Sequence, residues 1–149
     1  MEPRHTAVPT KKPRCYLVYA LAPGTLSAAE ANRTLNAFVA DASLPLALYH
    51  DHFIGERGGV ALFYVATPEE QTALFSSRHL RDWQVDFRPL IFSFSPSAFD
   101  EQIAFTLEQY RNEDWGTLQR EKRPSYGNPR EVSGDGVRKR MTPPSYLLN

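Results

Sequence analysis

The feature that most constrains the fold is an unbroken apolar and aromatic run, CYLVYALA at residues 15–22. Pro23-Gly24 ends this run, as expected for a turn after a buried strand. Ser27 and Glu30 then form a capping box, in which each side chain satisfies a free backbone N–H group at a helix start. Because apolar residues recur at helical spacing after this box, the sequence predicts a buried strand followed by an amphipathic helix to about residue 42.

The following segments predict a hairpin and a second helix. Residues 46–65 read as two strands around a glycine-containing loop at 55–59, which is typical of a β-hairpin. A second capping box, TPEE at 67–70, has proline at the first helical position, where its missing N–H group is not needed. We therefore expect a helix from this box to about Ser77.

A fourth strand and a third helix complete the predicted domain. Alternating apolar residues in 83–94 change phase near Pro89, which predicts a strand with a bulge or break at the proline. Ser97 is the expected N-cap of an amphipathic helix to about Asn112, and Trp115 could fasten the end of this helix to the core.

The predicted order is strand, helix, strand, strand, helix, strand and then an added C-terminal helix. This order is that of an α+β, ferredoxin-like βαββαβ sandwich. Over residues 15 to about 112, the aromatic strands and the extra helix also resemble the dimeric α/β-barrel superfamily. That resemblance implies that two ferredoxin-like units pack sheet against sheet, and hence a homodimer. Because the superfamily includes both enzymes and proteins without known activity, it implies no particular chemistry.

The net charge of zero hides an uneven distribution of charge along the chain. Residues 15–119 carry six Lys/Arg and thirteen Asp/Glu, a balance of −7. Residues 1–14 carry a balance of +3 and residues 120–149 a balance of +4. We therefore expect a ferredoxin-like domain at 15–119, between a basic N-terminal arm and a basic, largely irregular C-terminal arm.

The two arms contain the predicted partner-binding residues. Short basic clusters can neutralise nucleic-acid phosphates or an acidic protein face, and apolar residues spaced along a polar chain can anchor it to a partner. The basic candidates are Lys11, Lys12, Arg14, Arg120, Lys122, Arg123, Arg138, Lys139 and Arg140, and the apolar anchors are Tyr146, Leu147 and Leu148. A solvating linker is the alternative interpretation of such runs.

One pair of histidines is the main candidate for chemistry. His50 and His52 are two residues apart on a predicted strand, so their side chains project to the same face. They could share a metal ion with Glu56, or act as catalytic groups with Tyr49 in a pocket lined by histidine and tyrosine. Asp51 points to the opposite face and cannot easily orient either ring. A solvated strand face or a subunit contact is the alternative interpretation.

Several classes of function are not favoured by the sequence. No apolar run approaches the roughly 18 residues of a membrane-spanning helix, and no signal peptide is expected. The single cysteine, Cys15, fits a reducing cytoplasmic compartment,. Gly58-Gly59 lacks the lysine and the following helix of a phosphate-binding loop, so no cofactor is predicted.

The leading hypothesis is therefore a non-catalytic accessory or assembly subunit. Such a protein would dock through its sheet and its basic arms, in a homo-oligomer or in a larger complex. A dimeric α/β-barrel enzyme or small-molecule-binding protein is the second hypothesis. A protein that binds nucleic acid through its arms is the third.

Overall fold

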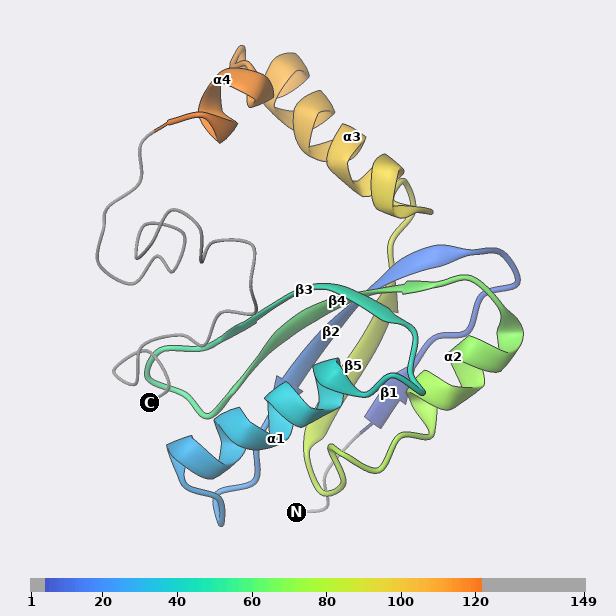
Figure 1. Cartoon of the computed structure of the whole chain (residues 1–149), viewed down its shortest axis with the longest axis vertical. Helices are drawn as coiled ribbons and strands as arrows, with labels where there is room; N and C mark the ends of the chain where they lie inside the picture. Colours follow the sequence, from blue (N-terminus) through green and yellow to red (C-terminus); the bar gives the residue numbers. More distant parts are fainter. Residues whose placement is uncertain (1–4, 122–149) are drawn as a thin grey trace.

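The computed structural model describes residues 5–121 and shows a mixed α+β fold with a five-stranded sheet, in the order β1-β5-β2-β4-β3 (Figure 1). The strands are β1 (His5–Ala7), β2 (Arg14–Leu21), β3 (Leu46–His52), β4 (Gly58–Val65) and β5 (Gln84–Pro89). The helices are α1 (Ala28–Ala40), α2 (Pro68–Phe75), α3 (Pro96–Thr106) and α4 (Trp115–Gln119), with a π-helical turn η1 (Leu107–Arg111) after α3. The predicted α+β class is confirmed.

The central strand β2 pairs antiparallel with β4 on one side and with β5 on the other. Its side chains alternate between two faces of the sheet. Tyr16, Val18 and Ala20 are fully buried, whereas Leu17 and Tyr19 on the other face are exposed. The continuous apolar run of β2 therefore supplies apolar side chains to both faces of the sheet.

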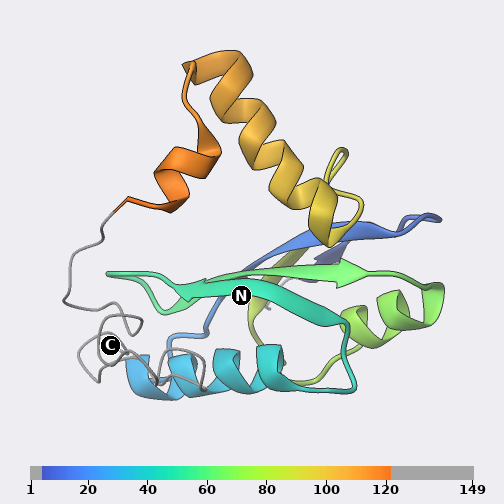
Figure 2. The same cartoon turned by 45° about the horizontal axis from the view of Figure 1, so that its top comes forward.

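Helices α1 and α2 cover one face of the sheet, and α3 and α4 rise from the opposite side (Figure 2). The core lies between the sheet and the first two helices. Its largest fully buried side chains include those of Trp83, Tyr16, Phe38, Phe63, Leu35 and Leu74. Helix α3 makes its main contacts with η1 and few with the strands, so it does not cover the second face as α1 and α2 cover the first.

The short strand β1 changes the expected sheet. It pairs in parallel with β5, so residues 5–7 of the basic N-terminal arm form an edge of the sheet. The hydroxyl of Tyr16 donates to the carbonyl oxygen of Val8 at 2.9 Å, and the amide of Thr10 donates to Oε1 of Gln71 at 2.8 Å. The resulting five-stranded order differs from that of the expected four-stranded ferredoxin-like sandwich.

The helix starts follow the capping signals, with one correction. The Ser27–Glu30 capping box of α1 is present with both of its hydrogen bonds. Thr67 caps α2, whereas the Glu70 carboxylate accepts from the amide of Ala66 and not from the cap residue. Helix α3 is capped by Ser95 and not by Ser97, because Pro96 occupies its first position, which suits the fixed φ of proline.

The fourth strand ends earlier than its apolar pattern predicts. Strand β5 stops at Pro89, and residues 90–95 leave the sheet as an irregular segment. This segment stays close to β2, because the amide of Leu90 donates to the carbonyl of Cys15 and the amide of Cys15 donates to that of Ser93. The side chains of Phe92 and Phe94 are mostly exposed. The expected break at the proline is therefore real, but no strand follows it within residues 90–121.

Close packing of β4 explains the Gly58-Gly59 pair. Both glycines are buried inside β4 and do not belong to the preceding turn. A Cβ atom on Gly59 would overlap the carbonyl oxygen of Asp51 and the side chain of Leu35, so only glycine allows β3 and α1 to approach β4 here.

We predict that Gly59→Ala lowers the free energy of unfolding by about 1–3 kcal/mol, because overpacking forces the backbone of β3 to move. Chemical denaturation of the full chain measures this loss. Gly24→Ala is the matched control, because a Cβ atom there meets no atom within 4 Å. Equal stability of the two variants would contradict the close approach of β3 and β4.

Candidate functional site

The sheet face opposite α1 and α2 carries a group of exposed apolar side chains. Leu17, Tyr19, Leu46 and Tyr49 are exposed to 37%, 42%, 62% and 51%. These four residues, from the central strand β2 and the edge strand β3, are called the sheet patch below. Large apolar surfaces of this kind mark interaction sites when they are contiguous.

The strand register explains why these side chains share one face. Leu17 of β2 and Tyr49 of β3 both lie opposite Leu62 of the intervening strand β4. Leu62 is only 3% exposed, which fits a position between two large apolar neighbours. Tyr19 also contacts the ring of Phe53, with ring centroids 5.2 Å apart. The sheet patch is therefore continuous across three strands.

A second apolar feature lies on the helical segment formed by residues 96–121. This segment is called the arm from here on, and it differs from the two basic terminal arms expected from the sequence. A cavity of about 630 Å³ opens between α3, α4 and the irregular segment before α3. Its lining is almost wholly apolar and includes Ile91, Phe92, Phe99, Ile103, Trp115 and Leu118. We call this cavity the arm groove. Its edge is fixed by the indole N–H of Trp115, which donates to the carboxylate of Asp100 at 3.1 Å.

His50 and His52 lie together on the face of β3 that α1 covers. Oδ1 of Asn36 in α1 is 3.2 Å from Nε2 of His50 and 3.0 Å from Nε2 of His52. This oxygen accepts a hydrogen bond from both rings, which requires the Nε2–H tautomer in each. The amide of Asn36 thus occupies the position between the two Nε2 atoms that a shared metal ion would need.

Both histidines favour the neutral form. Desolvation lowers the pKa of His50 although the Asp51 carboxylate opposes this effect, and desolvation with the neighbouring His50 lowers the pKa of His52. Nδ1 of His52 is buried without a hydrogen-bond partner in the described part of the chain. Two neutral rings that share one amide oxygen form a structural link between α1 and β3.

The other residues proposed for chemistry do not join this pair. Tyr49 lies on the opposite face of β3, where its hydroxyl donates to the carboxylate of Asp51 at 3.3 Å. The structure therefore does not bring the histidines and Tyr49 into one pocket. Glu56 is in the exposed turn before β4. Within residues 5–121, no group of three or more His, Cys, Asp or Glu side chains is placed to hold a metal ion.

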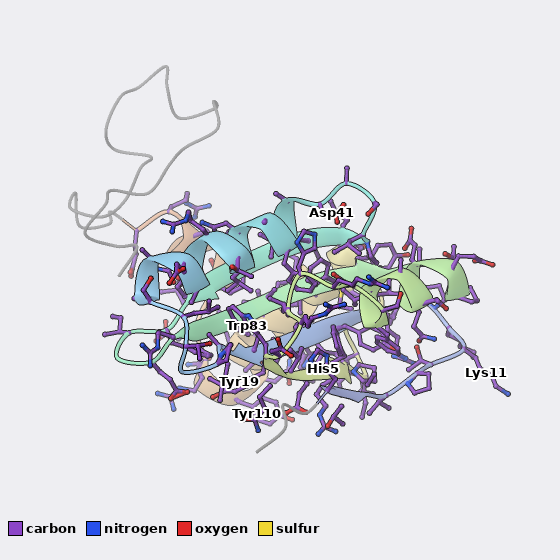
Figure 3. All side chains as sticks on the ribbon, turned by 90° about the horizontal axis from the view of Figure 1, so that it is seen from below. His5, Lys11, Tyr19, Asp41, Trp83 and Tyr110 are labelled. Carbon is purple, nitrogen blue, oxygen red and sulfur yellow. The ribbon has the colours of Figure 1, made fainter. Side chains whose placement is uncertain are left out.

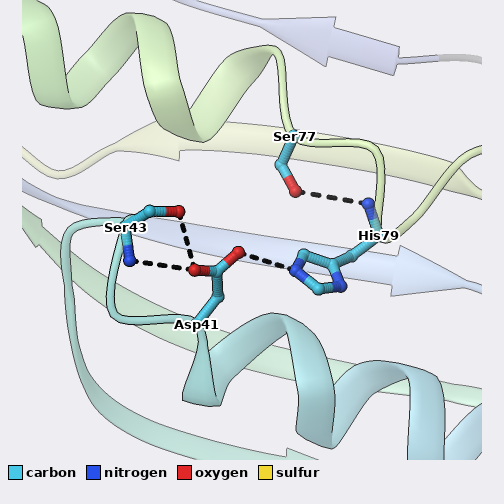
Figure 4. Close-up of polar contacts among 4 residues, drawn as sticks. All are labelled: Asp41, Ser43, Ser77 and His79. Atoms are coloured by element: carbon cyan, nitrogen blue, oxygen red, sulfur yellow. Dashed lines mark hydrogen bonds and ion pairs between the residues drawn. The ribbon is translucent and has the colours of Figure 1, made fainter.

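A separate polar cluster joins the end of α1 to the segment after α2 (Figure 4). Nε2–H of His79 donates to Oδ2 of Asp41 at 2.8 Å, and the hydroxyl and amide of Ser43 donate to Oδ1 of the same carboxylate. These hydrogen bonds, led by that of the Ser43 hydroxyl, lower the pKa of Asp41 to about 2. Ser77 accepts from the backbone amide of His79 and not from its ring, so the cluster lacks a serine nucleophile activated by histidine.

The structure describes only some of the predicted partner-binding residues. Lys11 and Lys12 are exposed at a bend before β2, and Figure 3 shows Lys11 at the periphery of the molecule. The guanidinium of Arg14 donates to the carbonyl oxygens of Leu90 and Ile91, so this residue is tied to the domain. Arg120 is exposed and ends α4. Lys122, Arg123, Arg138, Lys139, Arg140, Tyr146, Leu147 and Leu148 lie outside the described residues.

No protein-family model, curated protein or solved structure matches the chain. None of the helices within residues 5–121 has the length and hydropathy needed to cross a bilayer. The possible functions must therefore be inferred from the surfaces described above.

Two features of these sites were missed from the sequence. Asn36 is an ordinary polar position within the predicted helix, and only the register of β3 shows that it faces both histidines. The arm groove depends on the turn at Asn112, which has a left-handed backbone with φ 54°. A non-glycine residue in this conformation is most often Asn or Asp, so Asn112 was the available signal for the chain reversal between α3 and α4.

We predict that the two strand histidines make stability fall as the pH decreases below about 6.5, the ordinary pKa of histidine. Because their pKa values are lowered in the folded state, the unfolded chain binds more protons in this range. The stabilisation contributed by the two neutral rings is fully present above about pH 6.5. It is lost as the pH falls through the lowered pKa values that the rings have in the folded state. Denaturation midpoints of the wild type and of the double variant His50→Gln/His52→Gln, measured between about pH 5 and 8, should show a flatter profile for the variant.

The matched control is His5→Gln, which changes an exposed histidine of β1. It should retain the slope of the wild type. A double variant with the full wild-type slope would contradict the desolvated, neutral state of His50 and His52.

Proposed function

We propose that the protein is a non-catalytic assembly subunit that self-associates through the sheet patch. The observation that carries this proposal is the exposure of four large apolar side chains on one face of the sheet. Removing apolar surface from water contributes about 25 cal/mol per Å². Pairing of this face with a second copy would bury these side chains.

The topology supports a sheet-to-sheet dimer. If the edge strand β1 is set aside, the order β5-β2-β4-β3 is antiparallel throughout, with α1 and α2 on one face. We therefore assign these four strands and two helices to the ferredoxin-like class as part of the proposal. The resemblance of the sequence to the dimeric α/β-barrel superfamily, in which two ferredoxin-like units pack sheet against sheet, agrees with this proposal.

The size of the face indicates that α3 also contributes to the interface. Four strands spaced at about 4.8 Å and about 26 Å long present roughly 500 Å² in projection. A stable interface buries about 800 Å² on each partner. Helix α3 leaves the sheet on this same side (Figure 2), and Phe105 and Tyr110 on α3 and η1 are exposed to 48% and 74%. These two rings would add apolar area to the interface.

We predict that the wild type is a dimer in solution. Leu46→Asp/Tyr49→Asp should weaken dimerisation by about 100-fold or more, where each tenfold corresponds to about 1.4 kcal/mol of binding free energy. Both side chains are already exposed on an edge strand, so the monomer should remain folded. Sedimentation equilibrium measures the dissociation constant, and near-UV circular dichroism checks the fold.

Ile54→Asp is the matched control. Ile54 is 99% exposed in the turn after β3, and its substitution introduces the same kind of charge outside the sheet patch. A monomeric wild type at about 100 μM, or a double variant with undiminished dimerisation, would overturn the proposal.

A further inference from the structure

The arm groove is an apolar surface whose lining includes none of the residues assigned to the proposed dimer interface. It lies between α3 and α4 and not on the sheet patch. Its volume of about 630 Å³ falls in the range of ligand sites, which are mostly apolar clefts,. Gln102, Thr106 and Ser93 are the polar residues of its lining, and no charged side chain is among them. The groove therefore suits an apolar occupant and offers no partner for a buried charge.

The chain itself continues directly from the groove. Leu118 lines it, and α4 ends at Gln119, so the segment 122–149 starts at the edge of the groove. The 24 residues between Glu121 and Tyr146 are enough chain for this distance, since a linker of this length has a root-mean-square span of about 25–30 Å,. A short tether of this kind corresponds to an effective concentration in the millimolar range. The C-terminal residues can thus reach the groove without leaving their own molecule.

The composition of this segment matches the groove. Pro143-Pro144 precede Tyr146, Leu147 and Leu148, which form the most apolar run in residues 122–149. Proline favours extended backbone. In an extended chain the side chains of Tyr146 and Leu148 project to the same side. Two large apolar anchors would then enter the groove together, as in the recognition of short extended peptides.

The charges of the arm and of the segment are opposite. The arm at 96–121 carries six Asp/Glu and two Arg, a balance of −4. Residues 122–149 carry six Lys/Arg and two Asp/Glu, a balance of +4. The charged residues of the arm, among them Asp100, Glu108 and Glu113, are exposed. Such complementarity favours the docked state and fixes its orientation.

We infer that the C-terminal segment folds back onto its own arm and places Tyr146, Leu147 and Leu148 in the arm groove. The segment thereby acts as an intramolecular ligand for the apolar surface between α3 and α4. This inference does not depend on the sheet dimer, because the two surfaces are formed by different residues.

Tryptophan quenching in the full chain tests the inference. Trp83 is 1% exposed in the core, whereas Trp115 lines the groove and is half-buried. Acrylamide quenching therefore reports mainly on Trp115. We expect Leu147→Asp/Leu148→Asp to raise the quenching constant about threefold, because the docked state maintained by a high effective concentration is lost.

Ser125→Asp/Ser133→Asp is the matched control, since it adds the same charge to the same segment and keeps the apolar anchors. It should change quenching much less than the anchor variant. A labelled peptide of residues 137–149 should bind the anchor variant, whose groove is vacated, and should not bind the wild type.

Three results would overturn the inference. Equal quenching of the wild type and the anchor variant would show that the segment does not cover Trp115. A similar increase in both variants would assign the effect to charge and not to the apolar anchors. Shielding that appears only as the protein concentration rises would place the segment of a second copy in the groove. Because none of these readouts uses the sheet patch, failure here and failure of the proposed dimer are distinguishable.

Discussion

The architecture depends on the central strand β2, which is apolar on both faces and hydrogen-bonded on both edges. Both connections that flank it, β2–α1–β3 and β4–α2–β5, place their helix on the same side of the sheet (Figure 2). One apolar face of β2 is therefore buried within the chain, and the other is left to α3 or to a partner. The sheet patch and the outward direction of α3 are two consequences of this unequal coverage.

Local signals predicted the parts of the fold that depend on neighbours in the sequence. The Ser27–Glu30 box and Thr67-Pro68 mark helix starts because capping is a short-range hydrogen bond,. The strand β1 could not be predicted in this way, because three residues carry no periodic pattern and their pairing with β5 is long-range. The strand predicted for residues 90–95 is wrong for a similar reason. Their apolar residues alternate as in a strand, but β5 ends at Pro89 and the chain leaves the sheet to begin α3.

The histidine pair shows the same limit at the level of a site. The sequence predicted that both histidines lie on one face of a strand, because side chains two residues apart share a face. It could not predict their neighbours, because sheet register decides which helix and which tyrosines lie beside them. Asn36 satisfies both rings, and Tyr49 lies on the other side of the strand. The residue types suggested a shared site of histidine and tyrosine, but such a site depends on which face of β3 each residue occupies.

The face that each residue of β3 occupies depends on a single residue, Leu48. The register between β3 and β4 shifts at Leu48, since Ala47 lies opposite Phe63 and Tyr49 lies opposite Leu62. If Leu48 instead paired regularly with Leu62, residues 49–52 would each move by one position and exchange faces,. His50 and His52 would then lie on the face of the sheet patch, and Tyr49 would lie on the face that α1 covers. The same seven residues of the edge strand could therefore present either of two surfaces, and the bulge at Leu48 selects the one in which Tyr49 lies opposite Leu62 and both histidines face α1.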